Sequence, residues 1–209
     1  MSAVSSAFLV LLLLPLQESF VRFSYCHEYP TGLYEKQCID LKPDGTGQAS
    51  IKRRGTETSI YPLTLSASGQ ARVRLALAAT RGLADAQKYE SKKKVANLGR
   101  KHLVLETPSG NREADFNYSD LKEVVALTTL FDGLLNQQVV MVDMGLAAQY
   151  ERLSIPERLD ELERQLKVGQ IGDPPGLVPL LDKLITNDKI LQYARDHAQE
   201  LKDLVLRVK

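Results

Sequence analysis

Tryptophan is absent from this 209-residue sequence, and aromatic residues make up only 6% of it. Stacking platforms for bases or sugars are therefore scarce, which argues against a nucleic-acid partner. An excess of charge of one sign is lacking as well, since 27 Lys and Arg residues face 26 Asp and Glu residues, leaving a net charge of +1. A chain with this balance has no global attraction for nucleic acid or anionic lipid.

Sequence motifs that indicate a reaction are also missing. G-x-S-x-G, H-E-x-x-H, the P-loop and G-x-G-x-x-G do not occur, which removes most support for the hydrolase, zinc-protease and nucleotide-binding classes. His27, His102 and His197 each stand alone in the sequence, and a lone histidine is more typical of a surface or capping position than of catalysis. We therefore predict no catalytic residue, no metal ligand and no cofactor.

One apolar run, "AFLVLLLLPL" at residues 7–16, stands close to the first residue. As a helix it would span about 15 Å, roughly half of the hydrocarbon core of a bilayer, whereas its length and position are typical of a secretory signal. No Lys or Arg precedes the run and no small-x-small site follows it, so an uncleaved anchor and a misassigned start remain alternatives. We predict that residues 1–24 are signal-peptide-like, and that the protein is periplasmic or secreted and contacts a membrane only if this segment is retained.

Cysteine is limited to Cys26 and Cys38, twelve positions apart. In an oxidising compartment an even pair at this spacing is a plausible disulfide, and closing so short a loop would stabilise the fold by about 3 kcal/mol. Two free thiols are the alternative. A metal site that includes His27 is a third possibility, but no CxxC or HxxxH spacing supplies the remaining ligands.

Alternating polar and apolar residues predict strands in the first half of the chain. Residues 33–42 and 48–54 alternate around the turn "KPDGTGQ", which predicts a hairpin. Residues 58–65 predict a third strand, placed at a sheet edge because Pro62 cannot donate a ladder hydrogen bond. Ser66 then predicts the N-cap of a helix that runs to about Arg81.

A second set of strands and a second helix follow. Residues 102–118 form two alternating runs around "PSGN", and Ser119 opens a helix whose apolar residues recur at 3–4 spacing to Leu135. The order strands, helix, strands, helix predicts an α+β domain over residues 25–138, an antiparallel sheet built from hairpins with two helices on one face.

The remaining chain, residues 139–209, is predicted to be helical, as a C-terminal hairpin or small bundle. Helices are expected at 155–168, 177–185 and 190–205, with "GDPPG" as the break between the first two. The last two helices resemble one unit of a HEAT-type repeat, and a plain helical hairpin is the alternative. One such unit cannot bury its apolar face alone, so it must pack on the sheet domain or on a partner.

Basic residues are concentrated in two parts of the sequence. If the fold brings these parts together, they form a cationic patch for an acidic partner, a phosphate-rich surface or a membrane face. A solvated connecting loop is the alternative. The residues of this patch are Lys52, Arg53, Arg54, Lys92, Lys93, Lys94, Arg100 and Lys101.

The segments "DLKPDGTGQASIKRRG", "PLTLSASGQARVRLAL" and "GNREADFNYSDLKEVVALTTLFDGLL" together resemble a group of small bacterial extracytoplasmic domains, most of them uncharacterised. The emfourin type, which inhibits thermolysin-like metalloproteases, has a similar strand–helix layout. The likeness covers residues 33–138 and consists of turn and cap residues, so it carries over no inhibitory residue. With the signal-like start, it predicts an exported bacterial protein that binds another protein and is not an enzyme. An emfourin-type inhibitor and an enzyme with dispersed catalytic residues are the alternatives.

Overall fold

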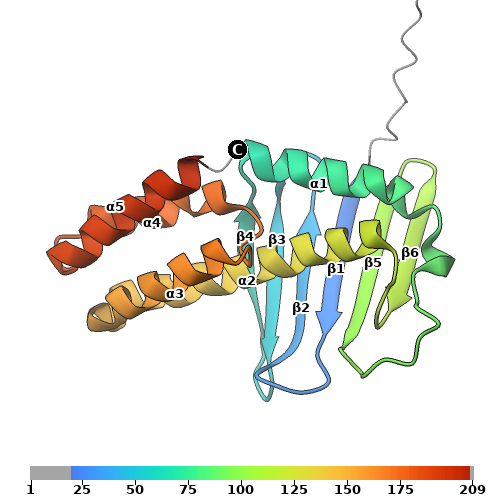
Figure 1. Cartoon of the computed structure of the whole chain (residues 1–209), viewed down its shortest axis with the longest axis horizontal. Coiled ribbons are helices and arrows are strands. Elements are labelled where there is room, and N and C mark those ends of the chain that lie inside the picture. The colour runs from blue at the N-terminus through green and yellow to red at the C-terminus, as the bar shows by residue number, and fades with distance from the viewer. Residues whose placement is uncertain (1–19, 208–209) are drawn as a thin grey trace, which may run out of the picture.

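A six-stranded antiparallel sheet forms one half of the structure (Figure 1), a computed structural model that describes residues 20–207. The apolar run at 7–16 lies outside the described residues. The strand order is β4-β3-β2-β1-β5-β6. The strands are β1 (Arg22–Glu28), β2 (Tyr34–Leu41), β3 (Thr46–Arg53), β4 (Thr58–Thr64), β5 (Arg100–Thr107) and β6 (Gly110–Phe116).

Two helices cover one face of this sheet, and the other helices lie beyond its β4 edge (Figure 1). This arrangement confirms the predicted α+β class, with two helices on one face of a hairpin-built sheet and helices at the C-terminal end. The helices are α1 (Ala67–Ala79), α2 (Lys122–Tyr150), α3 (Ile155–Lys167), α4 (Val178–Ile185) and α5 (Gln192–Arg207), and the short 3-10 turns are η1 (Arg81–Leu83), η2 (Ala86–Lys88), η3 (Arg152–Ser154) and η4 (Pro174–Leu177).

The edge position predicted for the strand that contains Pro62 is confirmed. Leu65 N donates to Gly45 O at 2.9 Å, and hydrogen-bonded pairs alternate along an antiparallel ladder. Pro62, opposite Gln48 on β3, therefore turns its ring nitrogen to the outer edge of the sheet. The missing N–H donor leaves no gap in the ladder, and it interrupts any strand that would add to this edge.

The central strand β1 was not predicted from the sequence. It lies between β2 and β5, and its side chains alternate, with Phe23, Tyr25 and His27 buried toward the helices. It begins at Arg22, within the range 1–24 that we assigned to the signal-like segment. A complete β1 therefore requires any cleavage to fall before Arg22.

Two hydrophobic cores share the single long helix α2. The first lies between the sheet, α1 and the early part of α2, where the rings of Phe23 and Phe131 are 4.8 Å apart. The second joins the later part of α2, including Met144, to α3, α4 and α5. The boundary that we placed after residue 138 thus falls inside a continuous helix of 29 residues.

Helix α2 begins later than predicted, and more than half of its most apolar window is buried. The expectation that Ser119 caps it was wrong, because Leu121 is the N-cap residue and Ser119 Oγ accepts a bond only from Leu121 N, at 3.3 Å. Within residues 20–207, α2 is the one helix long and apolar enough to cross a membrane, and 56% of its most apolar window is buried inside the protein. Its apolarity is accounted for by the two cores.

The buried carboxylate of Asp173 joins the sheet half to the helical half. Asp173 follows α3 in the "GDPPG" segment and is only 1% exposed. Its two oxygens accept bonds from Ser66 N at 2.7 Å and Ser66 Oγ at 2.5 Å, while its own N–H donates to Gln137 of α2 at 2.7 Å. Ser66 is the predicted N-cap of α1, and its Oγ also accepts from Gly69 N at 3.0 Å. One acid therefore holds the start of α1 and the middle of α2 together.

Two glycines allow the "GDPPG" segment to lie close to α1 and α2. A Cβ atom on Gly172 would lie 2.4 Å from Leu134 N, and one on Gly69 would lie 2.5 Å from Asp173 Cγ. Both distances are too short for any side chain, so the backbone of the "GDPPG" segment can touch α1 and α2 only because these positions lack one. Arg72 of α1 donates to Gly172 O at 2.8 Å and adds a second link.

We expect Asp173→Ala to lower the free energy of unfolding by about 3 kcal/mol, because Ser66 N and Oγ would lose a charged acceptor in a buried site. Urea denaturation followed by circular dichroism measures the change. Asp188→Ala is the matched control, since the side chain of Asp188 is exposed and makes no hydrogen bond or ion pair among the described residues. Equal stability of the two variants would contradict the role assigned to Asp173.

Candidate functional site

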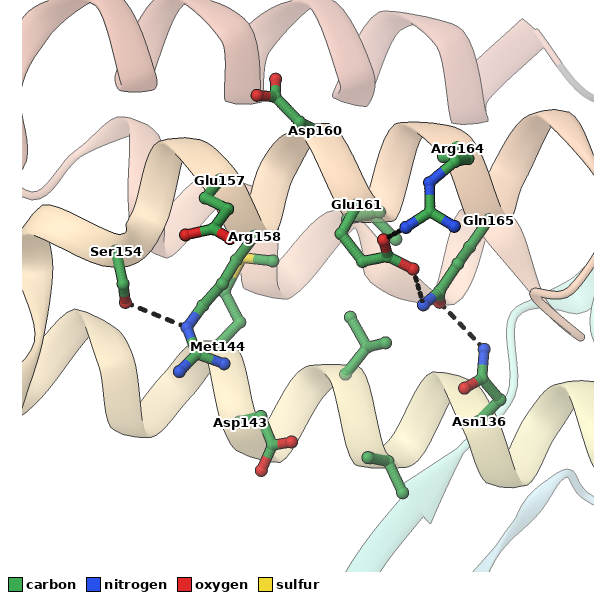
Figure 2. A pocket seen from close by; sticks show the side chains of 13 residues that line it. Asn136, Asp143, Met144, Ser154, Glu157, Arg158, Asp160, Glu161, Arg164 and Gln165 are labelled. Atoms are coloured by element: carbon green, nitrogen blue, oxygen red, sulfur yellow. Dashed lines mark hydrogen bonds and ion pairs between the residues drawn. The ribbon is translucent and has the colours of Figure 1, made fainter.

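A cleft of about 700 Å³ opens between α2 and α3 (Figure 2). After α2 ends, the chain reverses through η3, and α3 packs beside α2 through the buried side chains of Ile155, Leu159 and Leu162. The neighbouring face of α3 carries Arg158 and Glu161, which extend toward α2 in Figure 2. The helix periodicity thus places an apolar stripe in the core and a polar row along the opening.

The base of this α2–α3 cleft is apolar. Met144 of α2 and Leu162 of α3 line it and are almost completely buried. Val139 and Val140, one turn before Met144, line it at intermediate exposure. Val139 and Val140 therefore supply the apolar surface of the base that is still open to a ligand.

A polar network closes the end of the cleft nearest the sheet. Asn136 Nδ2 donates to Gln165 Oε1 at 2.9 Å, and Gln165 Nε2 donates to Glu161 Oε1 at 2.7 Å (Figure 2). Glu161 also forms an ion pair with Arg164. These bonds join Asn136, Gln165, Glu161 and Arg164 in one network, so polar side chains close this end of the cleft.

The opposite end leaves one acid without a cation. Arg158 donates to Ser154 Oγ at 3.0 Å and pairs with Glu151 at 3.2 Å, whereas Glu157 makes no ion pair or hydrogen bond within residues 20–207. Ser154 Oγ also donates to Glu151 O at 2.8 Å, and no histidine lines the cleft. The arrangement offers charge and apolar surface to a ligand but no nucleophile with an adjacent base.

A second, smaller cleft of about 380 Å³ adjoins the first. It lies between α2 and the β3–β4 edge of the sheet, and both clefts are lined by Val139 and Asp143. Tyr61 and Leu146 line its apolar part. Leu146 and Tyr150 follow one another at one-turn spacing and are 52% and 72% exposed. The exposed side of α2 is therefore apolar next to both clefts.

The predicted disulfide is present. Cys26 and Cys38 are bonded and lie directly opposite one another on β1 and β2. Their side chains point to the sheet face away from the helices, because the neighbours Tyr25 and His27 point toward α2. The alternatives of free thiols and of a metal site with His27 are not supported, since the thiols are joined and His27 lies on the other face.

His27 forms a buried cluster that the sequence did not reveal. We expected a surface or capping histidine, but His27 is 7% exposed. Its Nδ1 lies 3.0 Å from Asp132 Oδ1 of α2, and Tyr25 Oη donates to the same oxygen at 2.6 Å. The imidazole stacks on Tyr29 at 4.1 Å, and its Nε2 lies 3.3 Å from Leu98 O. The cluster ties the sheet to α2 and to the segment before β5. Both ring nitrogens of His27 have a partner within the protein.

The basic residues of the predicted patch lie at one end of the sheet, but four of the eight form ion pairs with Asp or Glu side chains. Lys52 of β3 and Arg100 of β5 are in one row, with Lys36 and Glu28 between them. Whether this end binds an anion remains a prediction. The ion pairs are Lys52–Glu35, Arg53–Asp143, Lys93–Asp120 and Arg100–Asp115, and Arg54 donates to the carbonyls of Gly32 and Tyr29.

Among residues 20–207, no group of three or more His, Cys, Asp or Glu side chains is placed to hold a metal ion. The chain matches no protein-family model, and no curated protein matches it. The likeness to emfourin-type domains therefore remains a prediction from the sequence pattern.

The two tyrosines of the His27 cluster, Tyr25 and Tyr29, make the stability of the fold depend on pH in the alkaline range. Burial raises the pKa of Tyr25 far above its usual value, and the charge of Asp132 and the hydrogen bond to it raise this pKa further; burial and Asp132 also raise the pKa of Tyr29. In the unfolded chain both phenols titrate near about pH 10. Above that pH the unfolded state loses protons that the folded state keeps, so the free energy of unfolding falls as pH rises.

We expect stability to decline above about pH 10 by about 1.4 kcal/mol per pH unit for each of these tyrosines, and Tyr25→Phe to remove one such contribution. Urea denaturation at a series of pH values from neutral to alkaline measures the slope. At neutral pH Tyr25→Phe should cost about 1 kcal/mol for the lost bond to Asp132, and the exposed Tyr193→Phe is the control for loss of a hydroxyl. An unchanged alkaline slope in Tyr25→Phe would contradict this account.

Proposed function

We propose that this protein is a non-enzymatic extracytoplasmic interaction module whose α2–α3 cleft binds a basic, partly apolar segment of another protein. The observation that carries this proposal is the combination of an apolar base and an uncompensated acid in one open cleft of about 700 Å³. An amphipathic helix placed in a hydrophobic groove is a common form of peptide recognition.

The apolar base supplies affinity for the non-polar side of such a segment. Met144 and Leu162 form the bottom of the cleft, and Val139 connects it to the second cleft at the sheet edge. Leu146 and Tyr150 extend the apolar surface along the exposed side of α2. Val139, Leu146 and Tyr150 place partly or largely exposed apolar side chains along about three turns of α2, which is long enough to accommodate a helical segment.

The charges around the cleft favour a basic ligand. Four acidic and two basic side chains line the cleft, and Glu157 has no basic partner among the described residues. A Lys or Arg beside Glu157 would form a new ion pair, whereas an acidic ligand would meet uncompensated negative charge. Charge complementarity thus selects Lys- or Arg-bearing partners, while the exposed apolar side chains in and beside the cleft contribute hydrophobic binding energy.

An extracytoplasmic location fits this role. The Cys26–Cys38 disulfide fits an extracellular protein, because disulfides persist in oxidising compartments. The apolar run at 7–16 supports export as well, because its length and position are typical of a secretory signal.

We expect the full chain to bind a fluorescent amphipathic helical peptide of Leu and Lys, and to bind its Leu and Glu counterpart much more weakly. Fluorescence anisotropy should show that Glu157→Lys weakens Leu/Lys binding by about tenfold, equivalent to about 1.4 kcal/mol. Glu200→Lys is the matched control, because Glu200 is exposed on α5 and changes the net charge equally. If both variants weaken binding to the same extent, binding follows net charge and the cleft is not the site.

We expect the mature protein to lack the apolar run and to begin before Arg22, because β1 needs Arg22 onward. Mass spectrometry of the N-terminal peptide from the extracytoplasmic fraction measures this directly. An intact Met1 on protein recovered from the cytosol would refute export without affecting the cleft.

A further inference from the structure

The sheet face opposite the helices carries a row of side chains centred on the disulfide. Cys26 lies directly opposite Cys38 on β2 and directly opposite His102 on β5. Residues paired in this way have Cβ atoms about 5 Å apart and side chains on the same face. Across the strands the row reads Asp115 on β6, His102 on β5, Cys26 on β1, Cys38 on β2 and Ser50 on β3.

The two sulfurs of this row differ in access and in neighbours. Cys38 is 9% exposed, whereas Cys26 has intermediate exposure. Cys26 is flanked by the imidazole of His102, and Cys38 is flanked by Ser50. Within residues 20–207, the side chain of His102 makes no hydrogen bond or ion pair, and Asp115, opposite His102 on β6, is paired with Arg100 at 2.5 Å. The His102 imidazole is therefore available to the neighbouring sulfur.

We propose that Cys26 and Cys38 form a thiol–disulfide exchange site for disulfide-bearing partners, with Cys26 as the reacting cysteine, Cys38 as the resolving cysteine and His102 as the residue that promotes ionisation of Cys26. A thiol beside an imidazole ionises more readily than an isolated thiol, and the thiolate is the reacting form. This site lies on the sheet face away from α1 and α2, apart from the α2–α3 cleft, and does not depend on the binding function proposed above.

The exchange conserves atoms and electrons. In the reduced protein the Cys26 thiolate attacks one sulfur of a partner disulfide, the partner S–S bond breaks, and the departing partner thiolate takes up a proton. Cys38 then loses its proton and attacks Cys26 Sγ, which forms the Cys26–Cys38 bond and releases the second partner thiol. The partner disulfide gains two electrons and two protons, and the protein dithiol loses both. A partner dithiol returns the protein to the reduced state by the reverse steps.

The reaction leaves the fold in place because other contacts hold β1. β1 is bonded along its length to β2 and β5, and on its helix side Tyr25 and His27 bond to Asp132. The charged groups that surround His102 and Cys26 on the open face are Arg100 on β5, Glu113 and Asp115 on β6, Arg22 and Glu28 on β1, and Lys36 and Asp40 on β2; of these, Arg22 pairs with Asp40 and Lys36 with Glu28.

The test uses the full chain, reduced with dithiothreitol, freed of reductant and exposed to oxidised glutathione. Intact mass spectrometry of acid-quenched samples follows the mixed disulfide. Cys38→Ser should trap glutathione on Cys26, and Cys26→Ser should react at Cys38 at least about tenfold more slowly, because Cys38 is less accessible and lacks the imidazole neighbour. Circular dichroism of each reduced protein checks that the fold is retained.

The role of His102 is tested by a pH profile in the Cys38→Ser background. His102→Asn should lower the rate of glutathione addition by about fivefold or more near pH 7, and the two rates should converge at alkaline pH, where Cys26 is ionised in either protein. Ser50→Ala, on the other flank of the pair, is the matched control and should leave the profile unchanged. Equal reactivity of the two cysteines, an unchanged profile in His102→Asn, or reduction only after unfolding would each show that the disulfide is structural alone and overturn the proposal.

Discussion

The buried carboxylate of Asp173 is the contact on which the arrangement of the two halves depends. Burying a charge is costly unless hydrogen-bond donors surround it, and Ser66 supplies both a backbone and a side-chain donor. Because Ser66 is also the N-cap of α1, the same bonds fix where that helix begins. The "GDPPG" segment is thereby held against the sheet half, and the helices that follow it have a defined starting position.

Helix α2 transmits this constraint to the cleft. It belongs to both cores, so its later part projects beyond the sheet edge without a flexible joint (Figure 1). The contact between Gly172 and Leu134 sets the distance between α2 and the chain that leaves α3. The opening between α2 and α3 therefore depends on contacts outside the cleft. Asn136, Gln165 and Glu161, which close its polar end, are connected by hydrogen bonds between the two helices and within α3.

Several features governed by local chemistry could be predicted from the sequence, although the Ser119 cap was wrong, and those governed by distant contacts could not. The Asp44–Gly45 turn was predictable because Gly45 adopts a φ of 80° and Asp44 accepts from Thr46 N. The Ser66 cap and the Pro62 edge strand follow from similar rules. By contrast, Tyr25 and Asp132 are 107 positions apart, as are Ser66 and Asp173. No sequence pattern indicates such pairs, and without β1 the burial of His27 and the neighbours of the disulfide could not be inferred.

Strand β1 gives the molecule two independent surfaces. Its alternation sends Tyr25 to the helix side and Cys26 to the open side, so chemistry at the sulfur does not pass through the core. The Cys26–Cys38 bond is one covalent link, and neither the two β-ladders of β1 nor the bonds to Asp132 pass through the sulfurs. If the exchange proposed for this cysteine pair takes place, these ladders and bonds are the contacts that would keep β1 in position.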